Sequence, residues 1–382
     1  MVEWKTIGSL LERKREKAKK TKEKYPVYAV TNNAGFVLSA SLHDFTIHSE
    51  DTSNYLVVNK NDFAYNPSRL NIGSIACYNK DIKGLISPMY VVFHADENII
   101  LAEYLYIVLK SEAVRNKIDS LKEVGARFRF DFDRWNLIYI PVPSLSEQQR
   151  IVDILYTFTF SIGNLKLQIA QRRKQYEYYR DQLLNLEGKE GVEMKTLGEI
   201  GVFIRGNGIQ KSDFVEEGFG CIHYGQIHAK YGFSAKETIS NINEPLYMKC
   251  KKARKGDVVL ATTSEDAEGV AKPFVWLGDE EVAVSGDAFI YHHNQNGKFI
   301  GHQFLTTKFM QFKVKYATGA KVVRISGDNM SKYKISLPSL EEQHRIVSIL
   351  DSFESSIQNL EQQLALREKQ YEYYRNKLLT FE

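Results

Sequence analysis

Residues 143–152 read PSLSEQQRIV, and residues 338–347 read PSLEEQHRIV. The two stretches continue in step, at an offset of 195 positions (338 minus 143), to Glu187 and Glu382. Most aligned positions are identical, and neither copy needs a gap. Such agreement indicates an internal duplication, and a duplication determines how the rest of the chain is divided.

The duplication also includes the start of each half. Residues 2–8 (VEWKTIG) match residues 192–198 (VEMKTLG), whereas most of the sequence between the matched ends differs. We therefore expect two modules of one fold that carry different surfaces. The predicted boundaries are 1–142 for the first module, 143–187 for the first repeated helix, 188–192 for a linker, 193–337 for the second module and 338–382 for the second repeated helix.

The composition is typical of a globular protein of more than one domain. The chain has 382 residues, of which 43% are hydrophobic and 26% charged. No apolar run approaches the roughly 20 residues that span a bilayer, and the start MVEWK is unlike a signal peptide, so we expect a cytoplasmic protein. The three scattered cysteines predict reduced thiols. A net charge of +4 permits a nucleic-acid partner without requiring one.

Both modules have the pattern of mixed α and β structure, so the predicted fold class is α+β. In the first module, β-rich runs at 27–30, 55–58 and 89–93 precede a helical spacing over 101–121. Residues 10–24 hold eight Lys or Arg side chains interspersed with Glu. For this run a solvated helix face is favoured over phosphate contact. The second module repeats the plan, with Gly-rich turns at 206–208 and 218–220.

The repeated stretches predict two long helices. Ser144 with Glu147, and Ser339 with Glu342, match the S-x-x-E capping box. Downstream, apolar residues follow the alternating four-three spacing of a heptad seam, and forty helical residues extend roughly 60 Å. The seam positions are Ile151, Leu155, Phe158, Ile162, Leu165, Ile169, Arg172, Tyr176, Tyr179, Leu183 and Leu186, with their counterparts 195 positions later. The Arg in each seam either sets the register or covers the seam edge.

Catalytic motifs are not found in the sequence. Residues 206–212 (GNGIQKS) satisfy neither the P-loop nor the dinucleotide-binding pattern, and therefore predict a turn. Residues 66–69 (NPSR) lack the second proline and the aromatic residue of the amino-methyltransferase motif. His292-His293 and the acidic residues at 265, 266 and 268 lack a third ligand at compatible spacing, so surface residues are favoured over a metal site. No catalytic or metal-binding residue is assigned, and a binding protein is predicted.

The repeated motif P-S-L-x-E-Q-x-R-I-V, followed by a heptad helix ending Y-E-Y-Y-R-x-x-L-L, resembles the specificity subunit of type I restriction-modification systems. The likeness spans the chain and includes 65–69 (YNPSR) and 256–265 (GDVVLATTSE). It implies two target-recognition domains, an antiparallel coiled coil between them and a pseudo-twofold internal repeat. Each domain would read one half of an asymmetric, interrupted DNA target. The coiled coil would set the spacer, on the order of one to two turns of DNA.

The resemblance also implies a chain without catalytic activity or a cofactor of its own. Its partners would be double-stranded DNA, two methyltransferase subunits docked on the coiled coil, and in some complexes two restriction-translocase subunits. S-adenosylmethionine, ATP and magnesium are expected in those subunits, and the methyltransferase would flip the target adenine out of the duplex. The alternative is a coiled-coil scaffold or regulator that binds DNA or protein outside a restriction system.

Candidate DNA contacts are polar and basic side chains near turns, because these side chains bind base edges and phosphates. They are Asn66, Ser68, Arg69, Arg127 and Arg129 in the first module, and Arg205, Asn207, Lys211, Thr263, Ser264, Lys321 and Arg324 in the second. At each position the alternative is an exposed loop residue or a turn-stabilising side chain.

The two long helices carry more tyrosine than one seam can bury. Some of these side chains are therefore expected to face the methyltransferase subunits, with internal packing as the alternative. The candidates are Tyr176, Tyr178, Tyr179, Tyr371, Tyr373 and Tyr374.

Overall fold

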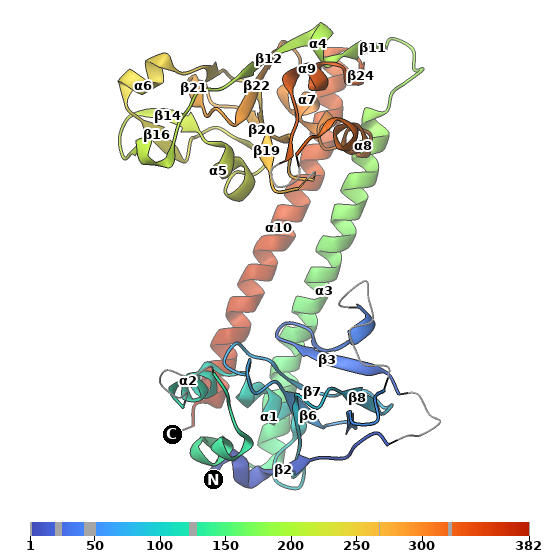
Figure 1. Ribbon diagram of the computed structural model, residues 1–382, viewed down its shortest axis with the longest axis vertical. Helices are drawn as coiled ribbons and strands as arrows, with labels where there is room; N and C mark the ends of the chain where they lie inside the picture. Colours follow the sequence, from blue (N-terminus) through green and yellow to red (C-terminus); the bar gives the residue numbers. More distant parts are fainter. Residues whose placement is uncertain are drawn as a thin grey trace. The chain divides into compact units, whose positions relative to one another are not determined.

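The computed structural model describes residues 2–19, 25–41, 51–121, 128–266, 268–319 and 323–381. The chain forms two compact units (Figure 1). Unit 1 comprises residues 1–166 and 363–382, and unit 2 comprises residues 167–362. Both units combine helices and sheets, which confirms the predicted fold class.

The repeated stretches form the two long helices that the sequence predicts. They are α3 (Leu145–Leu184) and α10 (Leu340–Leu379), each of 40 residues, and they are green and red in Figure 1. Each helix begins in one unit and ends in the other. Their N-terminal apolar residues are buried in the core of a unit, as Ile151 and Leu155 show for α3.

The helices run antiparallel within each unit. In unit 1 the first half of α3 lies beside the end of α10, and the rings of Phe158 and Tyr374 are 5.3 Å apart. In unit 2 the second half of α3 lies beside the start of α10, and the rings of Tyr179 and Phe353 are 5.5 Å apart. The two seams thus pair with each other, as the spacing predicts.

The seam arginines lie over aromatic rings of the neighbouring helix. The guanidinium of Arg172 is 6.0 Å from the ring centroid of Phe353, and that of Arg367 is 5.7 Å from the ring centroid of Phe158. A cation over an aromatic face is attracted by the ring's electron density. Of the two alternatives, the structure favours arginines that cover the seam.

The helix starts differ in part from the predicted capping boxes. The hydroxyl of Ser144 accepts a hydrogen bond from Glu147 N (3.4 Å), and Ser339 repeats this contact with Glu342 N (3.3 Å). The glutamate carboxylates, however, accept both of their hydrogen bonds from an arginine one turn along the helix, as in the pair Glu147 and Arg150. The second half of each predicted box is therefore replaced by a bidentate ion pair, which is the stronger interaction for a carboxylate.

A buried glutamine in each repeat fastens the long helix to its unit. The side chain of Gln148 is fully buried, accepts from Leu101 N (2.8 Å), and donates to Pro143 O (2.8 Å) and Ile99 O (2.9 Å). Gln343 makes the corresponding set in unit 2, with Asn296 N, Pro338 O and Gln295 Oε1. The glutamine of the repeated motif thus satisfies buried and partly buried polar groups that would otherwise lack partners.

Unit 1 contains two four-stranded sheets and a separate strand pair. The strands are β1 (Glu3–Thr6), β2 (Leu11–Lys14), β3 (Val27–Thr31), β4 (Gly35–Leu38), β5 (Leu56–Val58), β6 (Phe63–Tyr65), β7 (Ile75–Cys77), β8 (Gly84–Ile86), β9 (Val91–Ala95) and β10 (Tyr139–Val142). The sheet orders are β2-β9-β6-β7 and β4-β3-β8-β5, and β1 pairs with β10. Only β3 and β8 pair in parallel among these strands.

The helices of unit 1 include η1 (Ile7–Leu10), η2 (Ser39–Ser41), α1 (Ala102–Leu109), α2 (Glu112–Ser120) and η3 (Phe132–Leu137). The single helix expected over 101–121 is two helices, because the chain turns at Lys110 and Ser111 caps α2 by accepting from Val114 N. The helix expected in the basic run is also wrong: residues 11–14 form β2, which pairs with β9.

Unit 2 repeats this topology with added strands. The strands are β11 (Glu193–Thr196), β12 (Gly201–Arg205), β13 (Phe214–Val215), β14 (Phe219–Ile222), β15 (Ser234–Ala235), β16 (Ser240–Ile242), β17 (Lys252–Ala253), β18 (Val258–Ala261), β19 (Thr263–Ser264), β20 (Lys272–Trp276), β21 (Val282–Val284), β22 (Ala288–His293), β23 (Val323–Arg324) and β24 (Lys334–Leu337). The order β12-β22-β18-β20 matches β2-β9-β6-β7, and β16-β14-β21-β17 matches β4-β3-β8-β5, parallel pair included. The two units therefore share one framework.

The described helices of unit 2 include counterparts of α1 and α2. They are α4 (Leu197–Ile200), η4 (Lys211–Asp213), α5 (Tyr224–Ala229), α6 (Glu244–Lys249), α7 (Gly297–Gln303), α8 (Thr307–Tyr316) and α9 (Gly327–Ser331). The pair α7 and α8 corresponds to α1 and α2.

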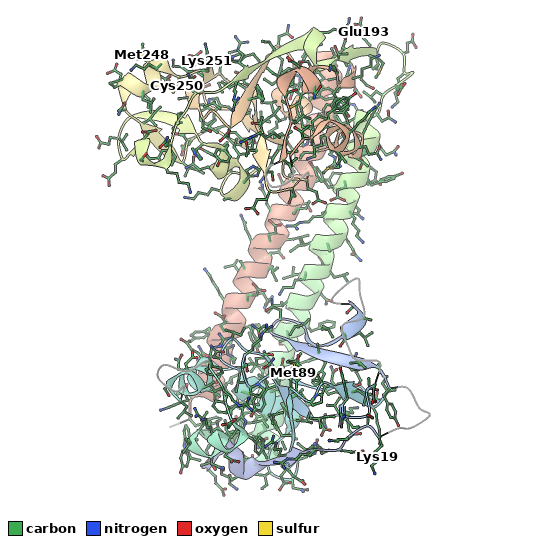
Figure 2. The ribbon with its side chains drawn as sticks, in the orientation of Figure 1. Lys19, Met89, Glu193, Met248, Cys250 and Lys251 are labelled. Carbon is green, nitrogen blue, oxygen red and sulfur yellow. The ribbon has the colours of Figure 1, made fainter. Side chains whose placement is uncertain are left out.

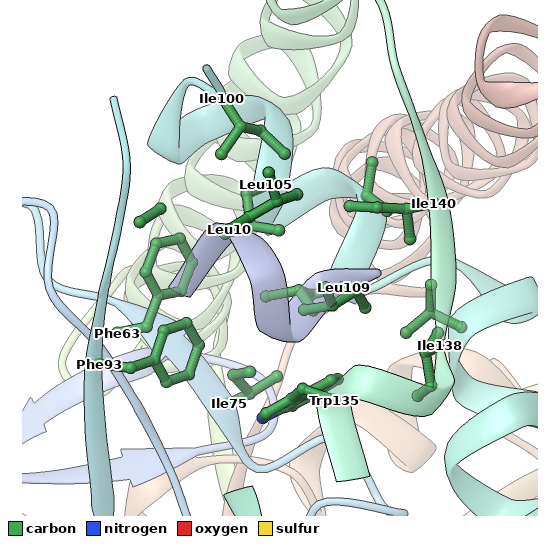
Figure 3. Packing of buried hydrophobic residues seen from close by; sticks show 14 of the residues in the cluster. Leu10, Phe63, Ile75, Phe93, Ile100, Leu105, Leu109, Trp135, Ile138 and Ile140 are labelled. Atoms are coloured by element: carbon green, nitrogen blue, oxygen red, sulfur yellow. The ribbon is translucent and has the colours of Figure 1, made fainter. Parts of the chain in front are cut away.

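The core of unit 1 lies between its first sheet, α1 and the start of α3. Figure 3 shows Phe63 and Phe93 side by side, with their ring centroids 5.1 Å apart, near Trp135. Leu105 and Leu109 of α1 complete this cluster, in which all five side chains are buried. The burial of such aromatic and aliphatic side chains is the main contribution to the stability of a unit of this size.

Candidate nucleic-acid interface

In unit 1 the loop 66–74 follows the central strand β6 and carries three of the predicted contacts. The side-chain oxygen of Asn66 accepts from Ser68 N (3.0 Å), and Asn66 N donates to Ser74 O (3.0 Å), which closes the loop. Ser68 and Arg69 are exposed at its tip. Asn66 thus stabilises the turn, and the two residues after it are available to a partner.

A fourth predicted contact of unit 1, Arg129, lies next to this loop. Phe130 N donates to Pro67 O (3.0 Å), which joins the segment 128–131 to the loop although the two are more than sixty positions apart in the chain. Arg129 is exposed and forms an ion pair with Asp131 at 3.1 Å. The neighbouring candidate Arg127 lies outside the described residues.

Arg13 is a further basic residue of this surface that the sequence analysis did not single out. Its guanidinium is 5.8 Å from the ring centroid of Phe132. Burial raises the pKa of the Tyr65 hydroxyl, and the positive charges of Arg13 and Arg129 both oppose that rise. The signal was the basic run at 10–24, of which Lys19 is labelled in Figure 2. The run favours a helix in the sequence, whereas residues 11–14 form the strand β2, which places Arg13 on this surface.

In unit 2 the corresponding loop follows β18 and carries Thr263 and Ser264. These residues form β19, which pairs with β23 so that Thr263 lies opposite Arg324. The structure therefore brings together candidates that are about sixty residues apart in the sequence. Lys321, which precedes β23, lies outside the described residues.

The remaining candidates of unit 2 lie around the turn between β21 and β22. Arg205 Nε donates to Gly286 O (2.9 Å), and its Nη2 is 3.7 Å from a carboxylate oxygen of Asp287. Thr262 N donates to Asp287 O (3.0 Å), which links this turn to the loop that carries Thr263. The Arg205 side chain is therefore next to the β19 surface.

Asn207 and Lys211 have different environments. The side-chain oxygen of Asn207 accepts from Lys251 N (2.5 Å; Lys251 is labelled in Figure 2), so this side chain holds two loops together. Lys211 is exposed. Burial lowers the pKa of His223, and the positive charge of Lys211 lowers it further. The close approach of the chain at 206 requires glycine, since a Cβ on Gly206 would be 2.3 Å from Ser285 O.

The two loops occupy the same place in the shared framework. Each follows the strand that pairs with β9 or β22, and each contacts a segment 195 residues from its counterpart, 128–130 in unit 1 and 323–325 in unit 2. Their surface residues differ: Ser68, Arg69 and Arg129 are exposed in unit 1, whereas in unit 2 Arg324 is exposed and Ser264 is half-buried. One framework thus presents two chemically different surfaces.

A buried aspartate anchors the base of each surface. Asp62 is fully buried and lies 2.9 Å from both Lys14 Nζ and His94 Nδ1. In unit 2, a carboxylate oxygen of the buried Asp257 is 2.6 Å from His292 Nδ1, so the His292 side chain is half-buried against this carboxylate and is not fully exposed on the surface as the sequence suggested. Within the described ranges, no group of three His, Cys, Asp or Glu side chains could hold a metal ion.

Two of the six candidate tyrosines are used inside the units. Tyr176 hydroxyl is 3.1 Å from His302 Nδ1 and donates to Glu354 at 3.3 Å, and Tyr371 packs on the core of unit 1. The other four are exposed at their outer edges, with Tyr178 at 61% and Tyr373 at 60%. Tyr179 and Tyr374 are also exposed, and each stacks one ring face on the neighbouring helix.

Comparison with known proteins agrees with this arrangement. The sequence model of the type I restriction modification DNA specificity domain matches the chain twice, over residues 1–172 and 189–367. The chain belongs to this family. Two matches in one chain correspond to two recognition domains, and the protein is a type I specificity subunit.

Individual relatives support the assignment. A specificity subunit of a type I restriction enzyme from Escherichia coli is 31% identical over 316 residues, which are 79% of this chain and 76% of the relative. A specificity subunit from Methanocaldococcus jannaschii is 26% identical over 349 residues, 86% of this chain and 80% of the relative. None of these relatives points to a scaffold outside a restriction system.

Solved structures share the fold. A chain of a type I restriction-modification system, solved to describe complex assembly and conformational transition, aligns over 99% of this chain and 97% of its own length, with a TM-score of 0.63 and 18% identity. The specificity subunit of M. genitalium aligns over 100% and 97%, with a TM-score of 0.57 and 15% identity.

The family assignment defines the role of the specificity subunit. It is the component that recognises DNA, and catalysis is not its role. As the specificity subunit of a restriction-modification system, it works with DNA and with other subunits of that system. Among the helices of the described segments, none is long and apolar enough to cross a membrane.

Proposed function

We propose that the two units read different halves of one interrupted, asymmetric DNA target. The observation that supports this is the repeated framework with different exposed residues: loop 66–74 beside 128–130 in unit 1, and loop 262–271 beside 323–325 in unit 2. Side chains at equivalent places on one fold meet equivalent positions of a duplex. Because the side chains differ, the two half-sites differ in sequence.

Within each unit the candidates divide between two tasks. Arg13, Arg69 and Arg129 in unit 1, and Arg205, Lys211 and Arg324 in unit 2, supply positive charge for phosphates and for guanine edges. Ser68, Thr263 and Ser264 have hydroxyl groups that can donate to or accept from either a base or a phosphate. Asn66 and Asn207 hold the turns that present these residues.

The long helices α3 and α10 are proposed to set the spacer between the half-sites and to dock the methyltransferase subunits. A 40-residue helix is about 60 Å long, which exceeds one turn of DNA. Tyr178 and Tyr373 are equivalent residues of the two repeats, and both are exposed. Exposed tyrosines favour protein interfaces, and two equivalent sites fit two copies of one partner.

The remaining parts of the system are assigned to the partners. S-adenosylmethionine, ATP and magnesium would bind the methyltransferase subunits and, where present, two restriction-translocase subunits, and this chain would hold no cofactor. The methyltransferase would flip the target base out of the duplex that the specificity subunit holds. Host DNA is the substrate of such a system, so the complex would work in the cytoplasm.

The test is methylation-sensitive sequencing of host DNA with the gene intact and with the gene deleted. We expect one bipartite, asymmetric motif to lose its methylation when the gene is absent. An unchanged methylation pattern would contradict the proposal and favour a scaffold or regulator. The variant Arg69→Ala should relax one half of the motif, while Lys117→Ala, an exposed lysine on α2 of the same unit, serves as the matched control.

A further inference from the structure

In both units a lysine ammonium binds the backbone of the loop behind the proposed DNA surface. Lys110 Nζ donates to Gly73 O (2.8 Å) and to Asn32 O (3.3 Å). Lys313 Nζ donates to Glu268 O (2.6 Å) and to Val270 O (2.9 Å). Gly73 lies two residues before β7 and Val270 lies two residues before β20, so both ammonium groups bind the end of the loop that leads into the equivalent strand.

The two lysines approach the equivalent ends of their loops from different helices. Lys110 follows the last turn of α1, whereas Lys313 lies within α8, the counterpart of α2. The position 195 residues after Lys110 is Leu305, which cannot make the contact. The two units thus obtain the same contact from side chains that do not correspond, which indicates that the contact with the loop matters more than the position of the lysine.

Both ammonium groups are held in surroundings that disfavour a charge. Lys313 is only 3% exposed. Burial lowers the pKa of Lys110 to about 8, helped by the nearby charge of Arg115, and burial lowers the pKa of Lys313 to about 8 against the charges of Asp266 and Glu268. A buried ammonium is tolerated when it donates strong hydrogen bonds. Here those hydrogen bonds go to the loops.

In each unit one of the two contacts is made to a buried residue of the loop, Gly73 in unit 1 and Val270 in unit 2. Gly73 has a left-handed conformation (φ +90°), and a Cβ there would be 3.3 Å from Arg115 Nη2. This part of the loop therefore passes close to the Arg115 guanidinium. Ser68 and Arg69, on the outer part of the same loop, remain exposed. In unit 2, Val270 is buried, whereas Ser264 is partly exposed. The lysines therefore hold the side of the loop that faces away from a partner.

We propose that Lys110 and Lys313 are positioning residues, which hold loops 66–74 and 262–271 in the shape that their outer side chains need to read DNA. The inference rests on the proposed function, in which these loops contact the half-sites. Neither lysine touches DNA. Each lysine acts through the loop carbonyls that it binds. Each affects only the half-site that its own unit reads.

The test uses the full chain assembled with its modification subunits. Competition binding, followed by fluorescence anisotropy, compares the target duplex with duplexes that carry one wrong base pair in either half-site. For Lys110→Met we expect discrimination at one half-site to fall about tenfold, the amount that one well-placed base contact supplies. Discrimination at the other half-site stays unchanged. Lys313→Met gives the reverse pattern.

The chain offers a matched control for each variant. Lys117→Met changes an exposed lysine of α2 in unit 1, and Lys315→Met changes an exposed lysine two residues from Lys313 on the same helix. Both controls should discriminate as the wild type does. Thermal unfolding of each complex shows that the variants are folded, and two lysines in two units keep the test available if one variant fails to fold.

A pH series gives a second measurement. A lysine that only stabilised the fold would not lower the discrimination between duplexes as the pH rises. Raising the pH from 7 to 9 removes the charge from amines with a pKa of about 8, and the hydrogen bonds to the loop lose their charge assistance. Wild-type discrimination should fall at both half-sites, and Lys110→Met should show no further fall at its own. The contribution of these lysines to global stability rises over the same interval, because folding lowers their pKa.

The charged and titratable groups that face these ammonium groups are Arg115 and Tyr106 for Lys110, and Asp266 and Glu268 for Lys313. Burial raises the pKa of Tyr106 to about 12, so this ring stays neutral throughout the series. Equal loss at both half-sites, or no loss in a folded complex, would overturn the inference. A wild-type complex that discriminates neither half-site would instead contradict the proposed function.

Discussion

Replacing Gln148 by Leu should destabilise unit 1, because three hydrogen bonds at the start of α3 depend on this side chain. The side chain is fully buried, and Leu has a similar volume, so the change removes polar contacts more than packing. A buried group left without a partner costs about 1–3 kcal/mol. Leu101 N and Ile99 O are only partly buried, so the lower part of that range applies to them, and the expected total is about 3–5 kcal/mol.

In a unit of this size each kcal/mol lowers the melting temperature by about 2–4 °C, so Gln148→Leu should lower it by roughly 6–20 °C. Thermal unfolding followed by circular dichroism at pH 7 measures the shift. Gln149→Leu is the matched control, because Gln149 is exposed and its amide donates only to Asp153 on the same helix. The reasoning is refuted if Gln148→Leu melts within 2 °C of the wild type, or if the control falls as far.

Three further predictions concern unit 2 and the DNA surface. Burial lowers the pKa of His302 to about 3, from an ordinary value of 6.5 in the unfolded chain. Between these two pH values the unfolded chain therefore binds one more proton than the folded chain. Stability should therefore fall as the pH decreases from 6.5 towards 3, by about 4 kcal/mol for this group, and urea titrations of His302→Phe should show a smaller fall. Gly206→Ala should cost more than about 2 kcal/mol in the same assay, because its Cβ would meet Ser285 O, whereas Gly208→Ala, with open space around it, should be nearly neutral. Arg129→Ala should reduce the slope of log affinity against log salt by about one if this arginine binds a phosphate, and an unchanged slope would exclude that role.

The long helices could be predicted because their signals are local. The heptad spacing and the motif around Gln148 lie within one stretch of chain, and the duplication doubled the evidence. The glutamate of the capping box was assigned to the wrong partner, since Arg150 competes for the same carboxylate and forms two hydrogen bonds with it. Sheet order could not be predicted, because it depends on pairings between strands far apart in the sequence.

The candidate surface shows the same division. Turn residues such as Asn66 and Gly206 marked the loops correctly. Nothing local, however, indicates that Pro67 meets Phe130 or that Thr263 pairs with Arg324. Arg13 was missed because a charged run has no apolar period, and the pairing of β2 with β9 decided its conformation.

The same limit applies to the two lysines behind the loops. Lys110 and Lys313 are not at matching positions of the repeat, so comparing the two halves of the sequence does not reveal that they make the same contact. Their shared role is seen only from the loop carbonyls that the two ammonium groups bind in the folded structure. Contacts of this kind depend on tertiary packing, which a pattern along the chain does not encode.

The most direct test of the central claim is to sequence methylated DNA from hosts that carry variants of one unit at a time. The variant Arg69→Ala with Arg129→Ala changes unit 1, and Thr263→Ala with Arg324→Ala changes unit 2. We expect each double variant to relax one half of the bipartite motif. The two variants should relax opposite halves, and the spacer should keep its length. Relaxation of the same half by both variants, or of both halves by either, would contradict the claim.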